Sequence, residues 1–319
     1  MYEVKISATG SYLPENVMTN DDLSRLVDTN DEWITSRTGI KQRRIANGEN
    51  TSDLAIKAAL NILNKSPLNP TDIDLIIVAT ISPDFFMPSI ACKVQQAIDA
   101  KNAFAFDISA ACSGFIYALN IATQYIKIGQ CKNALVIGAE VLSKLIDWKD
   151  RSTCVLFGDG AGGVILSASD TKGIIAINAG ADGNKGNILT CGAVNLENPY
   201  LSIKTNTKIK MQGNEVFKFA CRIIVESIQN VLRDTDYTLD DINYIIPHQA
   251  NSRIVECSAE KLNISKDKFF MNLDRYGNTS AASIPIALDE MADKELLKKG
   301  DKIILVGFGG GLTWGSALI

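Results

Sequence analysis

The segment that decides the fold reads CSGFIYALNIATQYI at residues 112–126. Its apolar residues leave no polar face, so the segment predicts a helix that is buried on all sides. A second uncharged segment, TSAASIPIAL at residues 279–288, predicts a similar helix later in the chain. Two such helices are covered completely only if each lies between sheets. The two segments together therefore predict a molecule of five layers.

Three apolar segments of the first half of the chain recur in the second half, in the same order. The pairs are DIDLIIV at 72–78 with DINYIIP at 241–247, FAFD at 104–107 with FFMN at 269–272, and LVIG at 135–138 with ILVG at 304–307. Their spacings are 241 − 72 = 169, 269 − 104 = 165 and 304 − 135 = 169 residues. Because order and spacing are both kept, the chain is predicted to contain an internal duplication.

Helical patterns alternate with these apolar segments. At residues 52–63 and 214–232, apolar side chains recur at three- and four-residue steps. The predicted strands are continuous apolar runs, as expected for a sheet that is covered on both faces. We therefore predict an α/β fold of two duplicated halves, residues 1–171 and 172–319, joined near the DTKG turn at 170–173.

The composition of the chain excludes several classes of protein. With 319 residues, 21% charged residues, 46% hydrophobic residues and a net charge of −4, the chain is neither disordered nor collagen-like. The slight acidity predicts no general attraction to nucleic acid or to anionic lipid. The longest uncharged run, residues 108–126, contains too many polar side chains to predict a membrane span.

The cysteines indicate the compartment. The seven cysteines form no C-x-x-C pair and show no spacing typical of a zinc site. Residues 1–10 lack the basic and apolar regions of a secretory signal. We therefore expect an intracellular chain with reduced thiols and no metal, in which a cysteine nucleophile is possible.

Three residues are candidates for chemistry. Cys112 stands at the start of the first uncharged helix, where unpaired backbone N–H groups and the helix dipole stabilise a thiolate. His248 is the only histidine and ends an apolar strand, where loops of α/β sheets collect reacting groups. Asn278 occupies the loop that the repeat places opposite Cys112. Each has a structural alternative: core packing for Cys112, a structural role for His248, and a turn or helix cap for Asn278.

Glycine-rich segments were considered as nucleotide sites. GDGAGG at 158–163 matches G-x-G-x-x-G, but the following VIL predicts a strand, whereas the dinucleotide fingerprint opens a helix. GADGNKG at 180–186 lacks the Gly-Lys-Ser/Thr ending of a P-loop. GFGGG at 307–311 follows the last major strand and predicts close backbone approach with exposed N–H donors.

A set of motifs runs in order along nearly the whole chain. They are DEWI at 31–34 with RTGI at 37–40, AACSGF at 110–115, FGDGAG at 157–162, GNEVFK at 213–218, PHQAN at 247–251, GNTSAA at 277–282 and FGGGLTWG at 308–315. With these motifs the sequence resembles the thiolase superfamily and, within it, the β-ketoacyl-acyl-carrier-protein synthase III family. The resemblance implies a thiolase-like, five-layered αβαβα sandwich and an enzyme that initiates type II fatty-acid synthesis.

The resemblance also implies a mechanism. Cys112 would take the acyl group of an acyl-CoA primer, expected to be acetyl-CoA, and hold it as a thioester. His248 and Asn278 would stabilise the enolate that forms when malonyl-acyl carrier protein loses carbon dioxide. N–H groups of Cys112 and Gly310 would form the oxyanion hole. No metal or redox cofactor is implied, because coenzyme A enters only as a thioester of the substrate.

Three binding regions follow from the same resemblance. For coenzyme A, Trp33 and Arg151 would sandwich the adenine, with Arg37 near the phosphates. The pantetheine tunnel would be lined by Met211, Gly213, Phe217, Ala250, Asn251 and Phe308. The acidic carrier protein would dock on Gln249, Ala250, Asn251, Ser252, Arg253, Lys218 and Lys261. The primer pocket would be lined by Met87, Leu142, Phe157 and Leu189. The structural alternatives are core packing for Trp33 and a solvated surface for the cations.

Two positions depart from the family's pattern. Glu260 stands where the family often has a second lysine beside Lys261, which predicts a weaker or shifted docking surface. Met87 stands where the family often has Phe, at a position that reaches across a homodimer interface to the partner's primer pocket. We expect a homodimer without nucleic-acid or membrane partners, in the cytoplasm or a plastid stroma.

Several functional alternatives follow from the same residues. A single histidine cannot supply the Cys-His-His set of elongating condensing enzymes. Plant-type polyketide synthases share the Cys-His-Asn set but usually have longer chains. Two hypotheses stay open beside an enzyme that initiates fatty-acid synthesis. One is an acyltransferase of specialised metabolism with the same three residues, and the other is a catalytically silent partner subunit.

Overall fold

Two sheets form the framework of the computed structural model, which describes residues 2–319. In spatial order, the strands of the N-terminal sheet are β1 (Glu3–Tyr12), β7 (Gly160–Ser169), β6 (Asn133–Glu140), β4 (Leu75–Ala79) and β5 (Phe104–Ile108). Strands β4, β5 and β6 are parallel, whereas β7 is antiparallel to β6 and β1. All five residues of β4 are buried, as its continuous apolar run predicts.

The second sheet repeats this order with one strand fewer. Its strands are β8 (Ala176–Ala181), β15 (Thr313–Leu318), β14 (Ile303–Gly309) and β13 (Tyr244–Pro247). Strands β13 and β14 are parallel, like β4 and β6. The internal duplication predicted from the sequence is therefore visible in the sheets. The boundary predicted after residue 171 lies between β7 and β8, and the division into two domains stays a prediction.

The strand predicted at 269–272 is the exception. Phe269 forms only an isolated bridge with Ile245, and no counterpart of β5 develops. The ladder stops because the N–H group of Asn272 donates to the side-chain oxygen Oε1 of Gln249 at 3.0 Å instead of to a neighbouring strand. The chain then enters the short helix α9 (Leu273–Tyr276).

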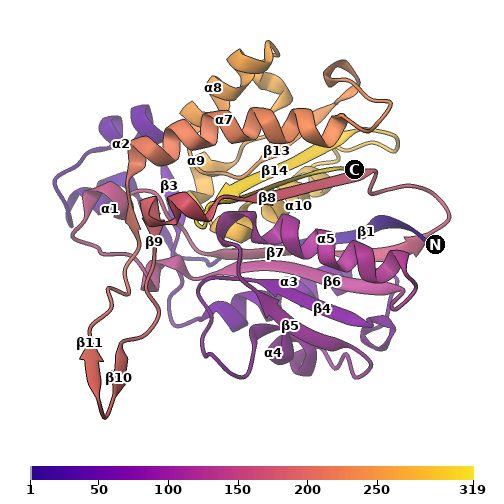
Figure 1. Ribbon diagram of the computed structural model, residues 1–319, viewed down its shortest axis with the longest axis horizontal. Coiled ribbons are helices and arrows are strands. Elements are labelled where there is room, and N and C mark those ends of the chain that lie inside the picture. Colours follow the sequence, from indigo (N-terminus) through magenta and orange to yellow (C-terminus); the bar gives the residue numbers. More distant parts are fainter. Residues whose placement is uncertain (1) are drawn as a thin grey trace.

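The two uncharged segments lie between the sheets, as predicted. They form α5 (Gly114–Lys127) and α10 (Ser283–Asp293), and each contacts strands of both sheets. Figure 1 shows the resulting layers, with α3 (Thr51–Asn64) and α4 (Ile90–Ala97) outside the first sheet and α7 (Gly213–Leu232) and α8 (Ser252–Leu262) outside the second. Three hydrophobic cores fill the spaces between these layers. The five-layer prediction is confirmed.

The prediction for the first central helix was partly wrong. Cys112 lies not in α5 but in the preceding 3₁₀ turn, Ala111–Ser113, and the α-helix begins at Gly114. Burial is also incomplete, because Gln124 is exposed in the last turn of the helix. Only the first half of α5, next to the turn, is buried almost all round. The counterpart 3₁₀ turn, Ser280–Ala282, leads into α10.

Shorter elements cover the end of the sandwich where these turns lie. They are β2 (Val17–Thr19), α1 (Asn20–Ser24), α2 (Asp31–Thr38), β3 (Gln42–Arg44), α6 (Arg151–Cys154), β9 (Leu189–Thr190) and β12 (Lys210–Met211). A hairpin of β10 (Leu196–Asn198) and β11 (Leu201–Ile203) projects from this end (Figure 1). None of the helices formed by residues 2–319 has the length and apolar character needed to span a membrane.

Candidate active site

The structure brings Cys112, His248 and Asn278 to one cavity of about 1040 Å³. Cys112 enters from the turn before α5, His248 from the residue after β13, and Asn278 from the loop before α10. All three side chains are buried at the bottom of the cavity. A sulfur, an imidazole and a carboxamide from three distant loops therefore line a shared cavity.

Cys112 is held in a tight turn at the centre of the molecule. The preceding residue, Ala111, has a φ of 45°, in the left-handed region that residues other than glycine seldom occupy. The last residue of β14, Gly309, packs directly behind the turn. A Cβ atom on Gly309 would lie 2.5 Å from the backbone nitrogen of Cys112, so only glycine fits there. Gly310 also lines the cavity, on the same side as Cys112.

The environment of the Cys112 sulfur differs from the sequence-based expectation. Burial raises the pKa of the Cys112 thiol to about 12, and the negative charge of Glu140 acts in the same direction. Burial thus opposes the thiolate that the sequence predicts, while a hydrogen bond from Ser280 acts against this rise in the pKa. Deprotonation of Cys112 must accompany its reaction.

His248 is fixed as a neutral hydrogen-bond donor. Its Nδ1 lies 2.7 Å from the hydroxyl oxygen of Ser283, which also accepts a hydrogen bond from the N–H group of Gln249 at 3.4 Å. When the Ser283 hydroxyl donates to Nδ1, the proton of the neutral ring lies on Nε2, and this is the tautomer that the proposed function requires. Burial lowers the pKa of His248 to about 3, so the ring carries no charge at neutral pH. Phe308 packs edge-on against the ring at 5.4 Å between centroids.

Asn278 is oriented through its carbonyl oxygen. Its side-chain Oδ1 accepts a hydrogen bond from the N–H group of Ser280 at 2.9 Å. The backbone of Asn278 is bonded on both sides to the chain around Phe157, by hydrogen bonds to Leu156 and from Gly158. Because Oδ1 is occupied, the side-chain NH₂ group is the part left for the cavity. Together with Nε2–H of His248, it provides donors for a developing oxyanion.

The cavity extends from these residues to the surface near α2. The expected coenzyme A residues that line it are Trp33, Arg37, Met211, Gly213, Phe217, Ala250, Asn251 and Phe308. Arg151 lies at the rim, with its guanidinium carbon 4.9 Å from the centre of the Trp33 ring. Arg37 contacts the same ring at 5.0 Å. Both guanidinium groups therefore contact the indole of Trp33, and an adenine stacked between Trp33 and Arg151 would have to displace Arg151 from this ring.

The expected primer pocket is only partly built by this chain. Leu142, Phe157 and Leu189 line the cavity. Met87 does not, because its side chain is 84% exposed, whereas its neighbour Phe86 does line it. Phe86, and not Met87, is thus the residue of this loop that lines the cavity of its own chain. Whether Met87 enters the cavity of a second chain stays a prediction.

The expected carrier-docking residues divide into two groups. Arg253 and Lys261 are exposed on α8, with Ala250, Asn251 and Ser252 half-buried before them, and no ion pair reaches either cation from the part of the chain described. Lys218 is exposed on α7 but pairs with Glu215 at 2.8 Å. Gln249 was predicted wrongly. Its side chain is 2% exposed and donates to the carbonyl of Pro247 at 2.7 Å, so it cannot contact a docked protein.

The sequence analysis missed three polar residues around the cavity. Ser283 bonds to His248, Ser280 lines the cavity beside Cys112, and Glu140 is completely buried nearby. One signal was present for Glu140, since an acidic residue that ends a buried apolar strand needs partners. Over residues 2–319, no cluster of three or more histidine, cysteine or acidic side chains is arranged to hold a metal ion.

Two family models match the chain. One, described as 3-oxoacyl-[acyl-carrier-protein (ACP)] synthase III, matches residues 106–183, and one for the C-terminal part of the same family matches residues 232–319. These ranges contain Cys112 in the first match and His248 and Asn278 in the second.

Curated relatives and solved structures agree with the family models. The β-ketoacyl-[acyl-carrier-protein] synthase III of Clostridium novyi is 61% identical and is aligned over 100% of this chain and 99% of its own length. That of Clostridium acetobutylicum is 58% identical, with the same coverage. The crystal structure of the 3-oxoacyl-[acyl-carrier-protein] synthase III from Aquifex aeolicus is 51% identical, with a TM-score of 0.93 over 99% of both chains.

The single histidine makes the electrostatics of the site directly measurable. With the pKa of His248 lowered to about 3, its ¹⁵N resonances should not titrate at any pH above about 5 and should show a proton on Nε2. Replacement of Ser283 by alanine should shift both nitrogen resonances, because Nδ1 loses its partner. Nitrogen-15 NMR of protein labelled at histidine measures both resonances, and they need no assignment to a residue because the chain has one histidine. A titration with a midpoint near the ordinary value of 6.5 would show that the ring is not buried as described.

Proposed function

The chain belongs to the 3-oxoacyl-[acyl-carrier-protein] synthase III family, and from this premise we propose how its residues carry out the reaction of a condensing acyltransferase of fatty-acid biosynthesis. The substrates are an acyl-CoA primer and malonyl-acyl carrier protein, and the product is a β-ketoacyl-acyl carrier protein. The observation that supports this assignment best is the meeting of Cys112, His248 and Asn278 in one buried cavity.

In the first half-reaction, Cys112 attacks the thioester carbonyl of the primer. The acyl group is transferred to Sγ, and coenzyme A leaves as the thiol. Backbone N–H groups of Cys112 and Gly310 are proposed to bind the oxyanion of the tetrahedral intermediate. The close packing of Gly309 against the Cys112 nitrogen supports this, because it holds the two backbone segments against each other before the substrate arrives.

In the second half-reaction, malonyl-acyl carrier protein loses carbon dioxide. The electrons of the broken bond move onto the thioester carbonyl, which becomes an enolate. Nε2–H of His248 and the NH₂ group of Asn278 are proposed to donate hydrogen bonds to this oxygen. The enolate carbon then attacks the acyl group on Cys112. Because decarboxylation itself produces the nucleophile, the reaction requires neither a strong base nor a bound cofactor beyond the coenzyme A thioester.

The mouth of the cavity suits the coenzyme A moiety and the carrier. Trp33, Arg37 and Arg151 combine an aromatic face with two guanidinium groups, which matches an adenine with phosphates. Arg253 lines the mouth and contacts the ring of Phe217 at 5.8 Å. Together with Lys261, which lies about two turns further along the same face of α8, it forms the proposed docking surface for an acidic carrier. Lys218 contributes less, because Glu215 offsets its charge.

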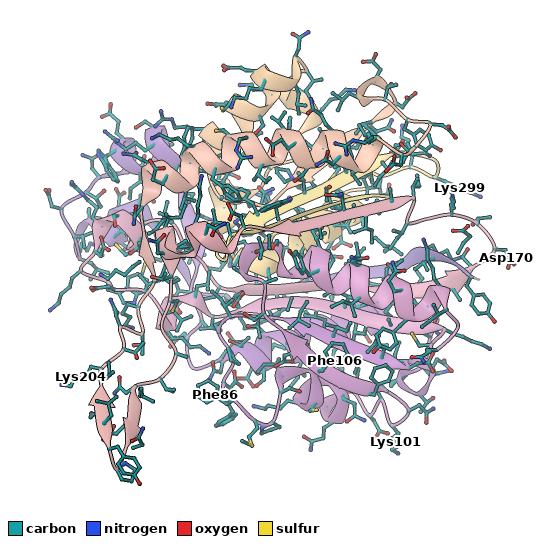
Figure 2. All side chains as sticks on the ribbon, viewed as in Figure 1. Phe86, Lys101, Phe106, Asp170, Lys204 and Lys299 are labelled. Carbon is teal, nitrogen blue, oxygen red and sulfur yellow. The ribbon has the colours of Figure 1, made fainter. Side chains whose placement is uncertain are left out.

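We propose that the protein is a homodimer. The loop Phe85–Met87 exposes three large apolar side chains, and β5 is an edge strand with Phe104 also exposed. Figure 2 shows Phe86 and Phe106 on the N-terminal half, which carries both features. Exposed apolar residues on an unpaired edge favour pairing with a second copy. Because the relatives reported above are bacterial, we propose the cytoplasm as the compartment and no longer the plastid stroma.

The relatives at 61% and 58% identity favour the proposed function over the two alternative hypotheses. A silent subunit would not be expected to keep Cys112, His248 and Asn278 in one cavity, with the last two held by hydrogen bonds. The relatives reported above, at 61% and 58% identity, both carry the same name as the family. An acyltransferase of specialised metabolism would differ in its acceptor, so tests with substrates separate it from the proposed function.

Replacement of the three central residues should separate the half-reactions. Cys112→Ser should abolish formation of the acyl-enzyme from acetyl-CoA. His248→Ala and Asn278→Ala should keep acyl loading but slow malonyl decarboxylation by about 100-fold each, since each removes one oxyanion donor. Mass spectrometry of the intact protein measures loading, and release of carbon dioxide measures the second step. Cys131→Ser, at a buried cysteine outside the cavity, is the control. If no primer of any chain length gives an adduct on Cys112, the proposed function is wrong.

Charge reversal on α8 should weaken the binding of malonyl-acyl carrier protein and leave the binding of acyl-CoA unchanged. Lys261→Glu is expected to raise the KM for malonyl-acyl carrier protein about fivefold at low salt and to leave primer loading from acyl-CoA unchanged. The effect should shrink as the ionic strength rises. Lys299→Glu is the matched control, because Lys299 lies at the opposite end of the view from α2 (Figures 1 and 2). Equal effects of the two substitutions would contradict the proposed docking surface.

Light scattering coupled to size-exclusion chromatography tests the oligomeric state. A homodimer should give twice the chain mass of 34.6 kDa. Replacement of both Phe86 and Met87 by serine should favour the monomer, because it removes exposed apolar area from the proposed interface. A mass of one chain for the unchanged protein at micromolar concentration would contradict the proposal.

A further inference from the structure

Two helices begin at the cavity and run away from it side by side. Gly213 and Phe217 of α7 line the cavity, as do Arg253 and Ile254 of α8. The later turns of both helices, which the structure describes in full, do not line it. The two helices also pack against each other on the outer face of the second sheet (Figure 1). They therefore run in the same direction.

One contact fixes the register between the two helices. The guanidinium carbon of Arg253 lies 5.8 Å from the centre of the Phe217 ring. Residues four apart lie on the same face of an α-helix, about one turn further along. Since 217 + 4 = 221 and 253 + 4 = 257, the next pair along this contact is Cys221 with Cys257. The geometry thus places one cysteine of each helix opposite the other.

The surroundings of the two cysteines agree with this register. Cys221 is buried and Cys257 is half-buried, as expected for a pair at the outer margin of the contact between two helices. Burial raises the pKa of the Cys221 thiol, and the neighbouring thiol of Cys257 acts in the same direction. Arg253 and Lys261, which lie one turn on either side of Cys257, oppose the rise.

The separation of the helices suits a covalent bond. Ile224 of α7 and Val255 of α8 belong to the same hydrophobic core, and the two helices are in direct contact. Helices in direct contact have axes about 8–10 Å apart and Cα atoms about 2.3 Å from each axis, so facing Cα atoms come within about 6 Å. A disulfide spans Cα atoms up to about 7 Å apart. The two thiols can therefore be joined without unfolding either helix.

We propose that Cys221 and Cys257 form a redox site that hydrogen peroxide closes to a disulfide between α7 and α8. Cys257 reacts first, because it is the more exposed of the two. Its sulfur attacks one peroxide oxygen, the O–O bond breaks and water leaves, which gives a sulfenic acid. The Cys221 sulfur then attacks the sulfur of Cys257, and the departing hydroxyl leaves as water with the Cys221 proton. The two thiols lose two electrons and two protons, and the peroxide is reduced to two molecules of water.

The disulfide should also change the cavity. An S–S bond of about 2.05 Å holds two sulfur atoms closer than a non-bonded contact does, so it draws α8 toward α7. Phe217 and Arg253 lie one turn away and line the cavity, which the bond should therefore narrow between these two side chains. This effect on catalysis rests on the proposed function, whereas formation of the disulfide does not.

Peptide mapping tests whether the disulfide forms. The folded protein is treated with hydrogen peroxide, the remaining thiols are blocked with N-ethylmaleimide, and the chain is digested with trypsin without reduction. Cleavage after lysine and arginine gives the peptides 219–222 and 254–261, each with one of the two cysteines. Mass spectrometry should find these peptides joined, and dithiothreitol should separate them.

Two variants and an internal control make this result specific. Cys257→Ser, at a half-buried position, should abolish the joined peptides. Cys221→Ser should stop the reaction at a sulfenic acid on Cys257, which dimedone labels. The exposed Cys92 and Cys191 should not be joined to Cys257 in the folded protein, whereas random pairing in unfolded chains would include them. If the two peptides stay separate in the unchanged protein after peroxide treatment, the proposed site is wrong.

Acyl loading tests the effect of the disulfide on the cavity. At a limiting concentration of acyl-CoA, the disulfide should slow transfer of the acyl group to Cys112 at least about twofold, because a small displacement in a substrate path costs rate. Dithiothreitol should restore the rate. The Cys257→Ser protein, treated in the same way, controls for oxidation of Cys112 itself and should lose less activity. Equal losses in the two proteins would contradict the narrowing of the cavity. Failure of the untreated protein to load any primer would instead contradict the proposed function, because the peptide map does not depend on acyl transfer.

Discussion

The site depends on a close contact between two backbone turns at the centre of the molecule. The turn Ala111–Ser113 before α5 and the turn Ser280–Ala282 before α10 meet where the two sheets face each other. The contact exists because glycines stand opposite the turns. A Cβ atom on Gly138 would lie 2.2 Å from the carbonyl oxygen of Ala281, and one on Gly309 would lie 2.5 Å from the nitrogen of Cys112. Any larger side chain would push a turn, and the groups on it, out of the cavity wall.

Burial at this contact sets the charge of every group that takes part. The low-dielectric surroundings raise the pKa of Cys112 and of Glu140 and lower that of His248, so each is driven toward its neutral form. A neutral imidazole with its proton on Nε2 is a donor to an oxyanion and not an acid. Burial therefore opposes both the thiolate form of Cys112 and the charged form of His248.

The outer part of the cavity differs from its base because it contains charged side chains near the surface. Trp33, Arg37 and Arg151 lie near the surface, where charged groups stay hydrated and cost little to place. Arg253 on α8 extends the positive charge toward the proposed carrier surface. In the proposed function, the charged parts of the substrates bind at the mouth, and bond formation takes place at the buried Cys112, His248 and Asn278.

The sequence by itself determined the duplicated α/β plan and the chemical identity of the site. Apolar periodicity predicted the strands and the two central helices, since solvent exclusion from a layered core leaves a local pattern. The motifs singled out Cys112, His248 and Asn278. Only the tertiary structure decided the rest. The strand at 269–272 stopped where Gln249 bonded to Asn272, Gln249 was buried instead of exposed, and burial raised the pKa of the Cys112 thiol. Hydrogen-bond partners and desolvation come from segments far apart in the chain, and no local pattern records which distant groups will surround a given side chain.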